Sequence, residues 1–483
     1  MRNTTMLTDL YQLTMMQGLY LAGKDSQEAV FDRFYRTNPC NGGYSIVAGL
    51  EHVIEYIKNI KFTNDDIEYL RGLTIFGEEF LDYLKKFRFT GDIWAIPEGT
   101  VVFPGEPLLR VHAKKNEALF IETALSMFLN HESLIATKAS RVRWAAKDDF
   151  LMEFGLRRAQ GTDAALYGAR AAVIGGFNAT SDVLAGKLFG IPVVGTMAHS
   201  WVMSFDNELA AFREYAKRYP DNALLLVDTY DTIGSGVPNA IKVFTEMKAA
   251  GVLKRYGIRL DSGDLAYLSK AARTMLDEAG FIGATITASN DLDEHLIADL
   301  KLQEAKISSW GVGTKLITSE GCSALGGVYK MAAEIGTETI PKMKISNNVE
   351  KITNPGIKKV FRIYDKKSGK IRADIITLAD EEIGTTDDLA LMDPTHSWKR
   401  MTLPRGSFTV QELLVPIFRN GECVYNQPDL LAIQQYAKEQ LLTLWDEYRR
   451  LVNPHVMKID LSDKLYDLKK ELIFCTAQKQ TSL

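Results

Sequence analysis

The stretch ALLLVDTYDTIGSGVPNAIKVFTEMKAAGVLKRYGIRLDSGDL, residues 223–265, decides the fold. It begins with an apolar run that ends in acidic residues, continues with an amphipathic segment over 237–251, and reaches a second apolar run at 257. Short apolar runs bounded by polar and glycine residues are typical of buried strands, and the segment between them has helical spacing. The stretch therefore predicts a strand–helix–strand unit with parallel strands.

The same alternation extends over 150–318, with further amphipathic helices predicted at 204–219 and 265–280. We interpret it as an irregular α/β barrel of about seven parallel strands, with a doubly wound open sheet as the alternative. The barrel is favoured because no glycine-rich dinucleotide fingerprint follows the first strand. The predicted strands are FLMEFGLR (150–157), AAVIGGF (171–177), IPVVGTMAH (191–199), ALLLVDTYD (223–231), GIRLDSGDL (257–265), ATITASNDLD (284–293) and SSWGVGTKLIT (308–318).

The flanking segments differ from this repeat, so we predict three domains: an N-terminal α+β domain over 1–135, the barrel catalytic domain over 136–343, and a C-terminal β-rich extension over 344–483. The lysine-rich segment 344–376 predicts an antiparallel β element with an exposed face. Other predicted elements are helices at Asp9–Ala22, Leu50–Ile60 and Pro428–Leu451, a strand at Ala29–Arg36 and a hairpin over 101–113.

Composition excludes several classes of function. The chain has 483 residues, of which 46% are hydrophobic and 24% charged, enough for a large core. Its net charge of -4 gives no basic field for a nucleic acid. The four cysteines form no C-x-x-C pair, and no apolar run is long enough to span a membrane. We expect a protein of the cytoplasm with no nucleic-acid or membrane partner.

Polar side chains gather where the predicted strands end, and in α/β barrels the active site lies at that edge. Guanidinium, imidazole, carboxylate and glycine-rich backbone together suit a small, multiply charged substrate. A phosphate would bind at GVGT (311–314) or ALGGVYK (324–330), where backbone N–H groups can approach an anion. Glycine turns after strands are also common in ordinary loops, so spacing alone does not decide between a phosphate-binding turn and a simple loop.

Six ordered motifs resemble those of the nicotinate phosphoribosyltransferases: TDLYQLTM (8–15), EFGLRRAQG (153–161), TSDVLAGKLFGIPVVGTMAHS (180–200), VDTYDT (227–232), RLDSGDL (259–265) and GVGT with LGGVYK (311–330). The resemblance covers most of the chain. It implies a type II phosphoribosyltransferase fold, a homodimer with shared active sites, and synthesis of nicotinate mononucleotide from nicotinate and phosphoribosyl pyrophosphate in NAD biosynthesis. ATP would be a co-substrate, and Mg²⁺ would arrive with phosphoribosyl pyrophosphate or ATP, so the sequence leaves a dedicated metal site unknown.

The resemblance also implies two catalytic residues. His199 would be the histidine that ATP phosphorylates, a task for which imidazole is suited because its free nitrogen is nucleophilic near neutral pH. Asp228 would accept the other ring N–H and fix the tautomer. The alternatives are a structural histidine at a strand end and an aspartate that caps a helix.

Eight substrate-binding residues are implied in the same way. Arg259 and Arg157 would bind the nicotinate carboxylate or a neighbouring phosphate, although either could belong to a structural ion pair. Thr196 would contact nicotinate. The remaining assignments are Phe154 and, from the partner subunit, Tyr11 for stacking on the pyridine ring, Asp261 for the ribose hydroxyls, and Gly313 and Thr314 for the 5′-phosphate, with Gly326 and Gly327 as further candidates.

Two competing functions remain open at this stage. A nicotinamide phosphoribosyltransferase would share the fold, and Asp182 could accept from an amide N–H₂ where it would repel a carboxylate. A non-catalytic sensor of nicotinate or nucleotide would keep the barrel but would have no use for a nucleophile at His199.

Overall fold

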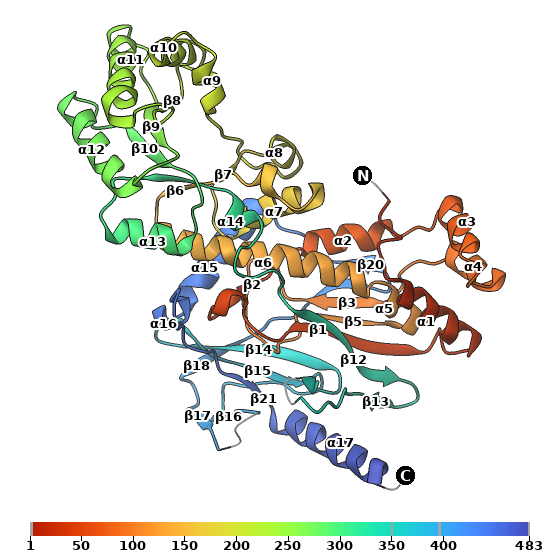
Figure 1. The fold of residues 1–483 in the computed structure, drawn as a ribbon. Coiled ribbons are helices and arrows are strands. Elements are labelled where there is room, and N and C mark those ends of the chain that lie inside the picture. The colour runs from red at the N-terminus through yellow and green to blue at the C-terminus, as the bar shows by residue number, and fades with distance from the viewer. Residues whose placement is uncertain (1–2, 349–350, 395–397, 482–483) are drawn as a thin grey trace. The chain divides into compact units, whose positions relative to one another are not determined.

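The computed structural model describes residues 3–348, 351–394 and 398–481. The chain forms two compact units, which meet in sequence inside the long helix α6 (Glu122–Ala146). Unit 1 combines Met1–Leu134 with Ala324–Leu483, and unit 2 is Ile135–Ser323. Figure 1 traces the chain through both.

Unit 2 contains a parallel sheet of six strands in the order β7-β6-β11-β10-β9-β8, curled into a half barrel. The predicted parallel α/β architecture is therefore confirmed, with six strands among the described residues instead of about seven. The strands are β6 (Phe150–Glu153), β7 (Ala179–Thr180), β8 (Ala223–Leu226), β9 (Tyr256–Leu260), β10 (Thr285–Ala288) and β11 (Ser309–Val312).

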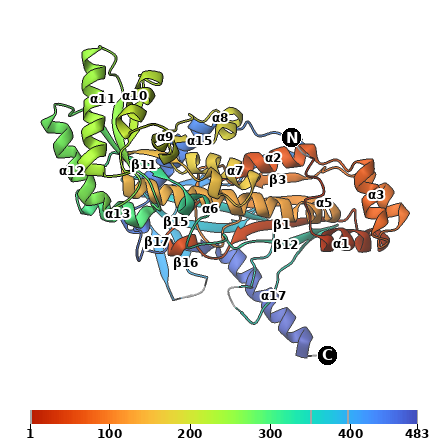
Figure 2. The same ribbon diagram turned by 45° about the horizontal axis from the view of Figure 1, so that its top comes forward.

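Helices follow these strands, and the three predicted amphipathic helices are confirmed as α10, α11 and α12, which lie side by side (Figure 2). Helix α11 buries an apolar face that includes Val243 and Phe244. Asn207 and Asp264 cap the N-termini of α10 and α12. The helical segments are η2 (Leu156–Arg158), α7 (Thr162–Ile174), α8 (Val183–Phe189), α9 (His199–Met203), α10 (Glu208–Arg218), η3 (Thr232–Gly236), α11 (Val237–Ala249), α12 (Leu265–Glu278), α13 (Glu294–Leu302) and α14 (Thr314–Ile317).

Two predicted strands of the barrel are wrong. The run 171–177 is the end of helix α7, because its alanines favour a helix and Gly175 and Gly176 end it. The run 191–199 forms one bridge, between Val193 and Thr180, and no longer strand. Pro192 has no N–H to donate to a ladder, which limits pairing at this point.

One sheet of unit 1 has the order β13-β12-β1-β5-β3-β19-β20, so strands of the N-terminal segment pair with strands that come after unit 2 in the sequence. The predicted helices at residues 9–22 and 50–60 and the strand at 29–36 are confirmed as α1, α2 and β1. The predicted hairpin over 101–113 is wrong, because β4 pairs with β2 while β5 pairs with β1 and β3. The elements are α1 (Leu10–Leu21), β1 (Glu28–Tyr35), η1 (Pro39–Asn41), β2 (Ser45–Ile46), α2 (Leu50–Asn59), α3 (Asn64–Gly72), α4 (Glu78–Lys85), β3 (Asp92–Ala95), β4 (Val101–Val102), β5 (Leu109–Lys114), α5 (Lys115–Phe120), β12 (Gly327–Ile335), β13 (Thr339–Pro341), β19 (Val415–Arg419) and β20 (Glu422–Cys423).

The C-terminal part of unit 1 contains the sheet β17-β16-β21-β15-β14-β18. The predicted antiparallel element is confirmed as the β14–β15 pair, but the expected exposed face is wrong, since both strands are largely buried. Arg362 and Asp374 are fully buried, and Arg362 Nη2 lies 2.6 Å from Asp374 Oδ2. Because each charge is compensated by the other, both residues can lie inside this layer. The strands are β14 (Lys358–Asp365), β15 (Ile371–Leu378), β16 (Leu389–Met392), β17 (Arg400–Leu403), β18 (Phe408–Glu412) and β21 (Ile459–Leu461).

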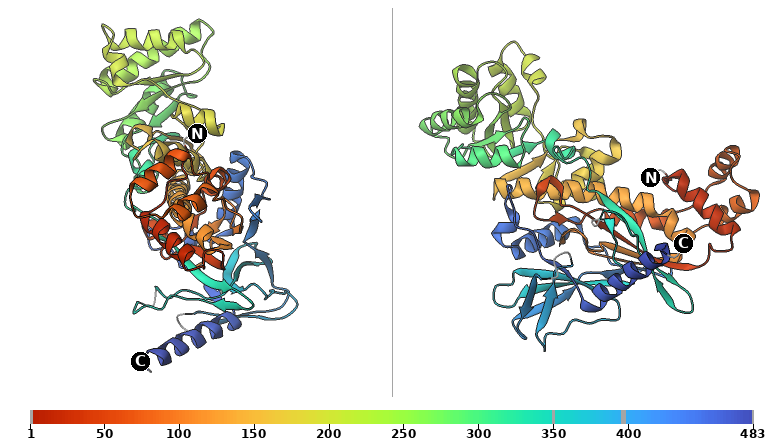
Figure 3. Two further views of the ribbon diagram at one scale, coloured as in Figure 1. Left: turned by 90° about the vertical axis from the view of Figure 1, so that its right-hand side faces the viewer. Right: turned by 60° about the horizontal axis from the view of Figure 1, so that its bottom comes forward.

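Three helices accompany this sheet. The single helix predicted over 428–451 is divided into α15 (Leu430–Thr443) and α16 (Asp446–Arg449), because Leu444 has extended backbone. Helix α17 (Asp463–Thr481), which was not predicted, contacts β15. It is the last described helix, at the blue end of the chain in Figure 3. Leu465 in its first turn packs against Ile376 and Leu461.

Candidate active site

The carboxyl ends of three neighbouring strands bring polar side chains together in unit 2. Arg259 lies near the end of β9 and Asp261 just beyond it, while Thr229 follows β8 and Ser289 follows β10. Parallel strands end at the same edge of a sheet, so loops that are distant in sequence become neighbours there. The predicted spatial convergence of strand-end residues is thus observed for these three strands.

Arg259 is the centre of the resulting network. Its Nε donates to Ser289 Oγ at 2.8 Å, its Nη1 to Thr196 Oγ1 at 2.9 Å, and its Nη2 to Asp261 Oδ1 at 2.8 Å. A guanidinium presents its donors in a rigid plane, so these contacts fix both its position and its orientation. The partners of this fixed guanidinium are two neutral hydroxyls and the Asp261 carboxylate, and a guanidinium can also bind an anionic ligand group.

Asp261 is partly buried and is ionised by its surroundings. Burial alone would raise the pKa of its carboxyl, but the Ser289 hydroxyl and the Arg259 guanidinium outweigh burial and lower that pKa below its usual value. Its Oδ1 accepts from both of those groups, while Oδ2 faces His199. A carboxylate in this state can accept from hydroxyl groups of a ligand or contact a cation.

His199 is the first residue of α9, and its side chain is 41% exposed. Its Nδ1 lies 3.2 Å from the Thr229 hydroxyl oxygen, and its Nε2 lies 3.8 Å from Asp261 Oδ2. The ring is thus held from two sides while solvent or a ligand can reach it. This geometry suits an imidazole that exchanges a proton or a phosphoryl group.

Asp228 binds the turn after β9 and not the imidazole. Its Oδ2 accepts from the Asp261 backbone N–H at 2.8 Å and from the Ser262 hydroxyl at 2.7 Å, while its Oδ1 is buried and has no partner among the described residues. The expected hydrogen bond from the ring to Asp228 is therefore corrected. The next residue, Thr229, takes that position, in the bend that follows β8.

Phe154 supplies a flat apolar surface next to Arg259. The Arg259 Cζ atom lies 5.9 Å from the centroid of the Phe154 ring, within the range of a cation–π contact. A Cβ atom on Gly311 would lie 2.6 Å from the same ring, so this position on β11 has room for glycine alone. The ring and the guanidinium could together contact an aromatic acid.

Gly313 and Thr314 form the turn from β11 into α14. Gly313 is the N-cap residue, and Thr314 begins the helix. Lys315, which follows, forms an ion pair with Asp293 at 2.9 Å, and Asp293 also caps α13 by accepting from the Leu296 N–H. This pair connects the loops after β10 and β11, so the position of the predicted phosphate-binding turn depends on it.

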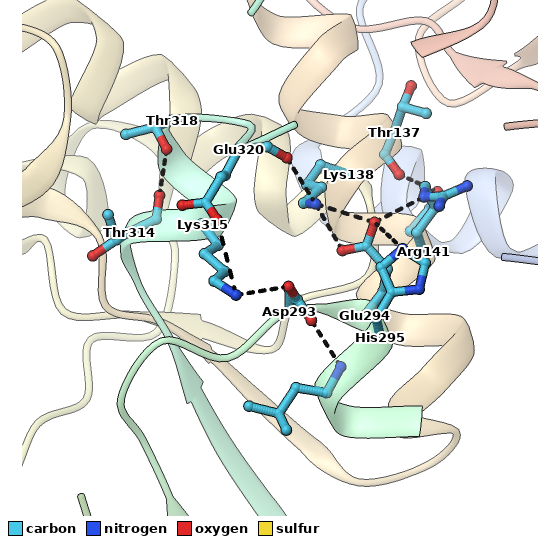
Figure 4. A network of polar contacts seen from close by, with 12 residues as sticks. Thr137, Lys138, Arg141, Asp293, Glu294, His295, Thr314, Lys315, Thr318 and Glu320 are labelled. Carbon is cyan, nitrogen blue, oxygen red and sulfur yellow. Dashed lines mark hydrogen bonds and ion pairs between the residues drawn. The ribbon is translucent and has the colours of Figure 1, made fainter. Parts of the chain in front are cut away.

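A buried ionic cluster lies behind these loops (Figure 4). Glu294 is almost fully buried; the Lys138 Nζ lies 2.8 Å from its Oε2, and the Arg141 Nε lies 3.0 Å from its Oε1. Lys138 also donates to the Glu320 carbonyl at 3.2 Å. Because both cations belong to α6, the cluster fixes α13 and the loop after α14 to this helix.

Three residues named from the sequence are not joined to the network. Arg157, in η2, is exposed and makes no polar contact among the described residues. Tyr11 belongs to unit 1 and is 49% exposed on α1. Asp182 is buried, and its Oδ1 accepts from the N–H groups of Leu184 and Ala185, so it caps helix α8.

Thr229 and Ser289 are members of the network that the sequence did not single out. Both are small hydroxyl residues next to the acidic or amide residues that were noted, Asp228 and Asn290. The only sequence feature that could have indicated them is their position after a strand.

Across 3–348, 351–394 and 398–481, no group of three or more His, Cys, Asp or Glu side chains could hold a metal ion. None of the described helices is long and apolar enough to cross a membrane.

Family models match nearly the whole chain. The N-terminal domain model of nicotinate phosphoribosyltransferase matches residues 6–130, the family model matches 150–351, and the C-terminal domain model matches 357–469. The nicotinate phosphoribosyltransferase of Bacillus subtilis (strain 168) is 47% identical, with 96% of this chain and 94% of the relative covered. That of Caenorhabditis elegans is 36% identical, with 95% and 92% covered.

Solved structures agree with these matches. The crystal structure of human nicotinic acid phosphoribosyltransferase superposes with a TM-score of 0.86 at 30% identity, covering 96% of this chain and 99% of the human one. A nicotinate-nucleotide pyrophosphorylase from Pyrococcus furiosus has a TM-score of 0.68 at 23% identity, with 91% and 96% covered, which is a likeness of fold.

Proposed function

The chain belongs to the nicotinate phosphoribosyltransferase family, and we propose that the network around Arg259 is where it performs that reaction. The enzyme transfers a phosphoribosyl group from phosphoribosyl pyrophosphate to nicotinate in NAD biosynthesis. The bond from the anomeric carbon to pyrophosphate breaks, and the pyridine nitrogen forms a new bond to that carbon. Because pyrophosphate leaves as an anion, the protein mainly positions reactants and balances charge.

The observation that carries the proposal is the fixed guanidinium of Arg259 beside the Phe154 ring, with neutral hydroxyls on two of its sides. In our proposal Arg259 and Thr196 bind the nicotinate carboxylate, and Phe154 stacks on the pyridine ring. Arg157 is a second candidate for an anionic group, since it is exposed and carries no ion pair among the described residues. Tyr11 would cover the other ring face from the partner subunit of a homodimer.

The phosphoribosyl donor is assigned to the neighbouring loops. Asp261 would accept from the ribose hydroxyls, and Gly313 and Thr314 would donate backbone N–H groups to the 5′-phosphate. Mg²⁺ would come with the pyrophosphate or ATP. Such an ion would keep its phosphate-oxygen ligands, since the described residues include no group of three or more His, Cys, Asp or Glu side chains that could hold it.

ATP would phosphorylate His199, and hydrolysis of the phosphohistidine would favour mononucleotide formation. Support comes from the half-exposed ring and from its two polar neighbours, Thr229 and Asp261. Asp228 would act by holding the backbone of Asp261 in place. We also propose that the reaction takes place in the cytoplasm, with the chemistry in the segment 136–343.

Acceptor selectivity tests the proposal. Initial rates are measured with nicotinate and with nicotinamide, each with and without ATP. A charge-assisted hydrogen bond contributes ~1.5–3 kcal/mol, so kcat/KM should be about 10- to 100-fold higher for the acid. Asp182 does not decide between the two acceptors, because its Oδ1 caps α8 while its buried Oδ2 has no partner among the described residues. Equal or faster turnover of nicotinamide would contradict the assignment of Arg259, and no turnover with either acceptor would support a sensor.

A further inference from the structure

Ser289 is a buried hydroxyl between the two charged residues of the candidate site. It directly follows β10, and only 3% of it is exposed. Its Oγ accepts from Arg259 Nε at 2.8 Å and donates to Asp261 Oδ1. Because Arg259 Nη2 also donates to that same carboxylate oxygen, the three side chains close a ring of hydrogen bonds.

The backbone holds Ser289 at this point. Its N–H donates to the Leu260 carbonyl at 3.0 Å, and the preceding residue, Ala288, pairs with Leu260 in the parallel β9–β10 register. The serine is therefore anchored to β9 between Arg259 and Asp261. A hydroxyl on such a short side chain has little conformational freedom, so the sheet fixes its position. The hydroxyl in turn fixes the positions of both charged groups.

We propose that Ser289 is a positioning residue that sets the geometry of Arg259 relative to Asp261, and through them the alignment of nicotinate with the ribose of the donor. The inference rests on the proposed function, in which Arg259 binds the acid and Asp261 the ribose hydroxyls. Transfer requires the pyridine nitrogen to face the anomeric carbon, and small errors in such an alignment are costly. One hydroxyl thus connects the binding sites of both substrates.

A merely structural serine would make a different prediction. Replacing it would lower the stability of the fold but would leave the KM for each substrate unchanged. The groups that face Asp261 are Arg259 from β9, His199 from α9 and Ser289 after β10. Without the Ser289 hydroxyl the pKa of Asp261 should rise, because one of the interactions that lower it is lost.

The experiment compares Ser289→Ala with Ser269→Ala. Ser269 is a fully buried serine of α12 in the same unit, and its hydroxyl contacts only backbone groups, Ala266 O and Lys306 N. For Ser289→Ala we expect the KM for nicotinate and for phosphoribosyl pyrophosphate to rise about tenfold each. The acidic limb of the pH–rate profile should move to higher pH. Ser289→Thr, which keeps the hydroxyl, should restore most of both effects.

The outcomes distinguish the positioning role of Ser289 from the proposed function itself. Wild-type KM values and an unchanged acidic limb in Ser289→Ala would overturn the positioning role, and so would equal changes in Ser269→Ala. If Ser289→Ala does not fold, Ser289→Cys decides, because a thiol is nearly isosteric but a weak hydrogen-bonding group. A wild-type enzyme that does not convert nicotinate would instead refute the proposed function.

Discussion

The hydroxyl oxygen of Thr229 lies 3.2 Å from Nδ1 of His199. When Nδ1 carries the ring proton, the Thr229 hydroxyl oxygen accepts a hydrogen bond from this N–H. Nε2 then keeps the lone pair that a phosphoryl acceptor needs. Nε2 faces the carboxylate of Asp261 at 3.8 Å, so the same ring also contacts the residue assigned to the ribose. This relationship leads to the first two predictions.

His199→Ala should retain slow synthesis of nicotinate mononucleotide and lose its stimulation by ATP, because the phosphoryl acceptor is gone. The measurement is the ratio of initial rates with and without ATP. His112→Ala is the control, since His112 lies on β5 of unit 1 and pairs there with Glu28. ATP stimulation that persists in His199→Ala would contradict the role of the ring as acceptor.

Thr229→Val removes the hydroxyl but keeps the β-branched shape. We expect less labelled phosphohistidine from labelled ATP and a several-fold smaller ATP stimulation, because the imidazole loses the partner that fixes its tautomer. Thr229→Ser should behave like the wild type. If the valine variant forms phosphohistidine at the normal rate, the hydroxyl does not orient the ring.

Arg259→Lys tests the planar arrangement of the cation. A single ammonium cannot reach Ser289, Thr196 and Asp261 as the guanidinium does, so we expect the KM for nicotinate to rise about tenfold or more. Arg255→Lys is the control, because Arg255 is exposed and lies just before the first residue of β9. A normal KM in Arg259→Lys would remove Arg259 from the acid-binding site.

Glu294→Gln should destabilise the protein by about 3–5 kcal/mol at pH 7, because Lys138 and Arg141 would remain buried without their anion. Burial alone would raise the pKa of Glu294, but Lys138 and Arg141 lower it overall. A lowered folded pKa means that this stabilisation is complete above the ordinary carboxyl pKa and is lost as the pH falls through the folded value.

Urea denaturation of wild type and Glu294→Gln between pH 7 and pH 3 measures this dependence. The difference between the two proteins should become smaller on acidification. Glu246→Gln is the control, because Glu246 pairs with Arg213 on the surface and about half of each side chain is exposed. A difference that does not change with pH would show that the charge of Glu294 is not its source.

Local patterns in the sequence were enough for the class of fold and for many elements. Helix α1 (Leu10–Leu21) lies within the helix predicted over Asp9–Ala22, and the helices between the strands have the expected periodicity. Alternation of strands and helices predicted a parallel sheet, whose strand ends then indicated where Arg259 and Asp261 would gather. These signals are carried by neighbouring residues in the chain, so sequence alone contains them.

The partners of each side chain were decided by the tertiary structure. Thr229 contacts His199 where Asp228 was expected, and Ser289 joins Arg259 to Asp261, because strand register and the direction of each strand-end residue determine which groups meet. The buried Arg362–Asp374 pair likewise reversed the expectation of an exposed face. Hydrogen bonds and ion pairs between distant residues depend on distances of a few ångströms, and spacing along the chain does not specify these distances.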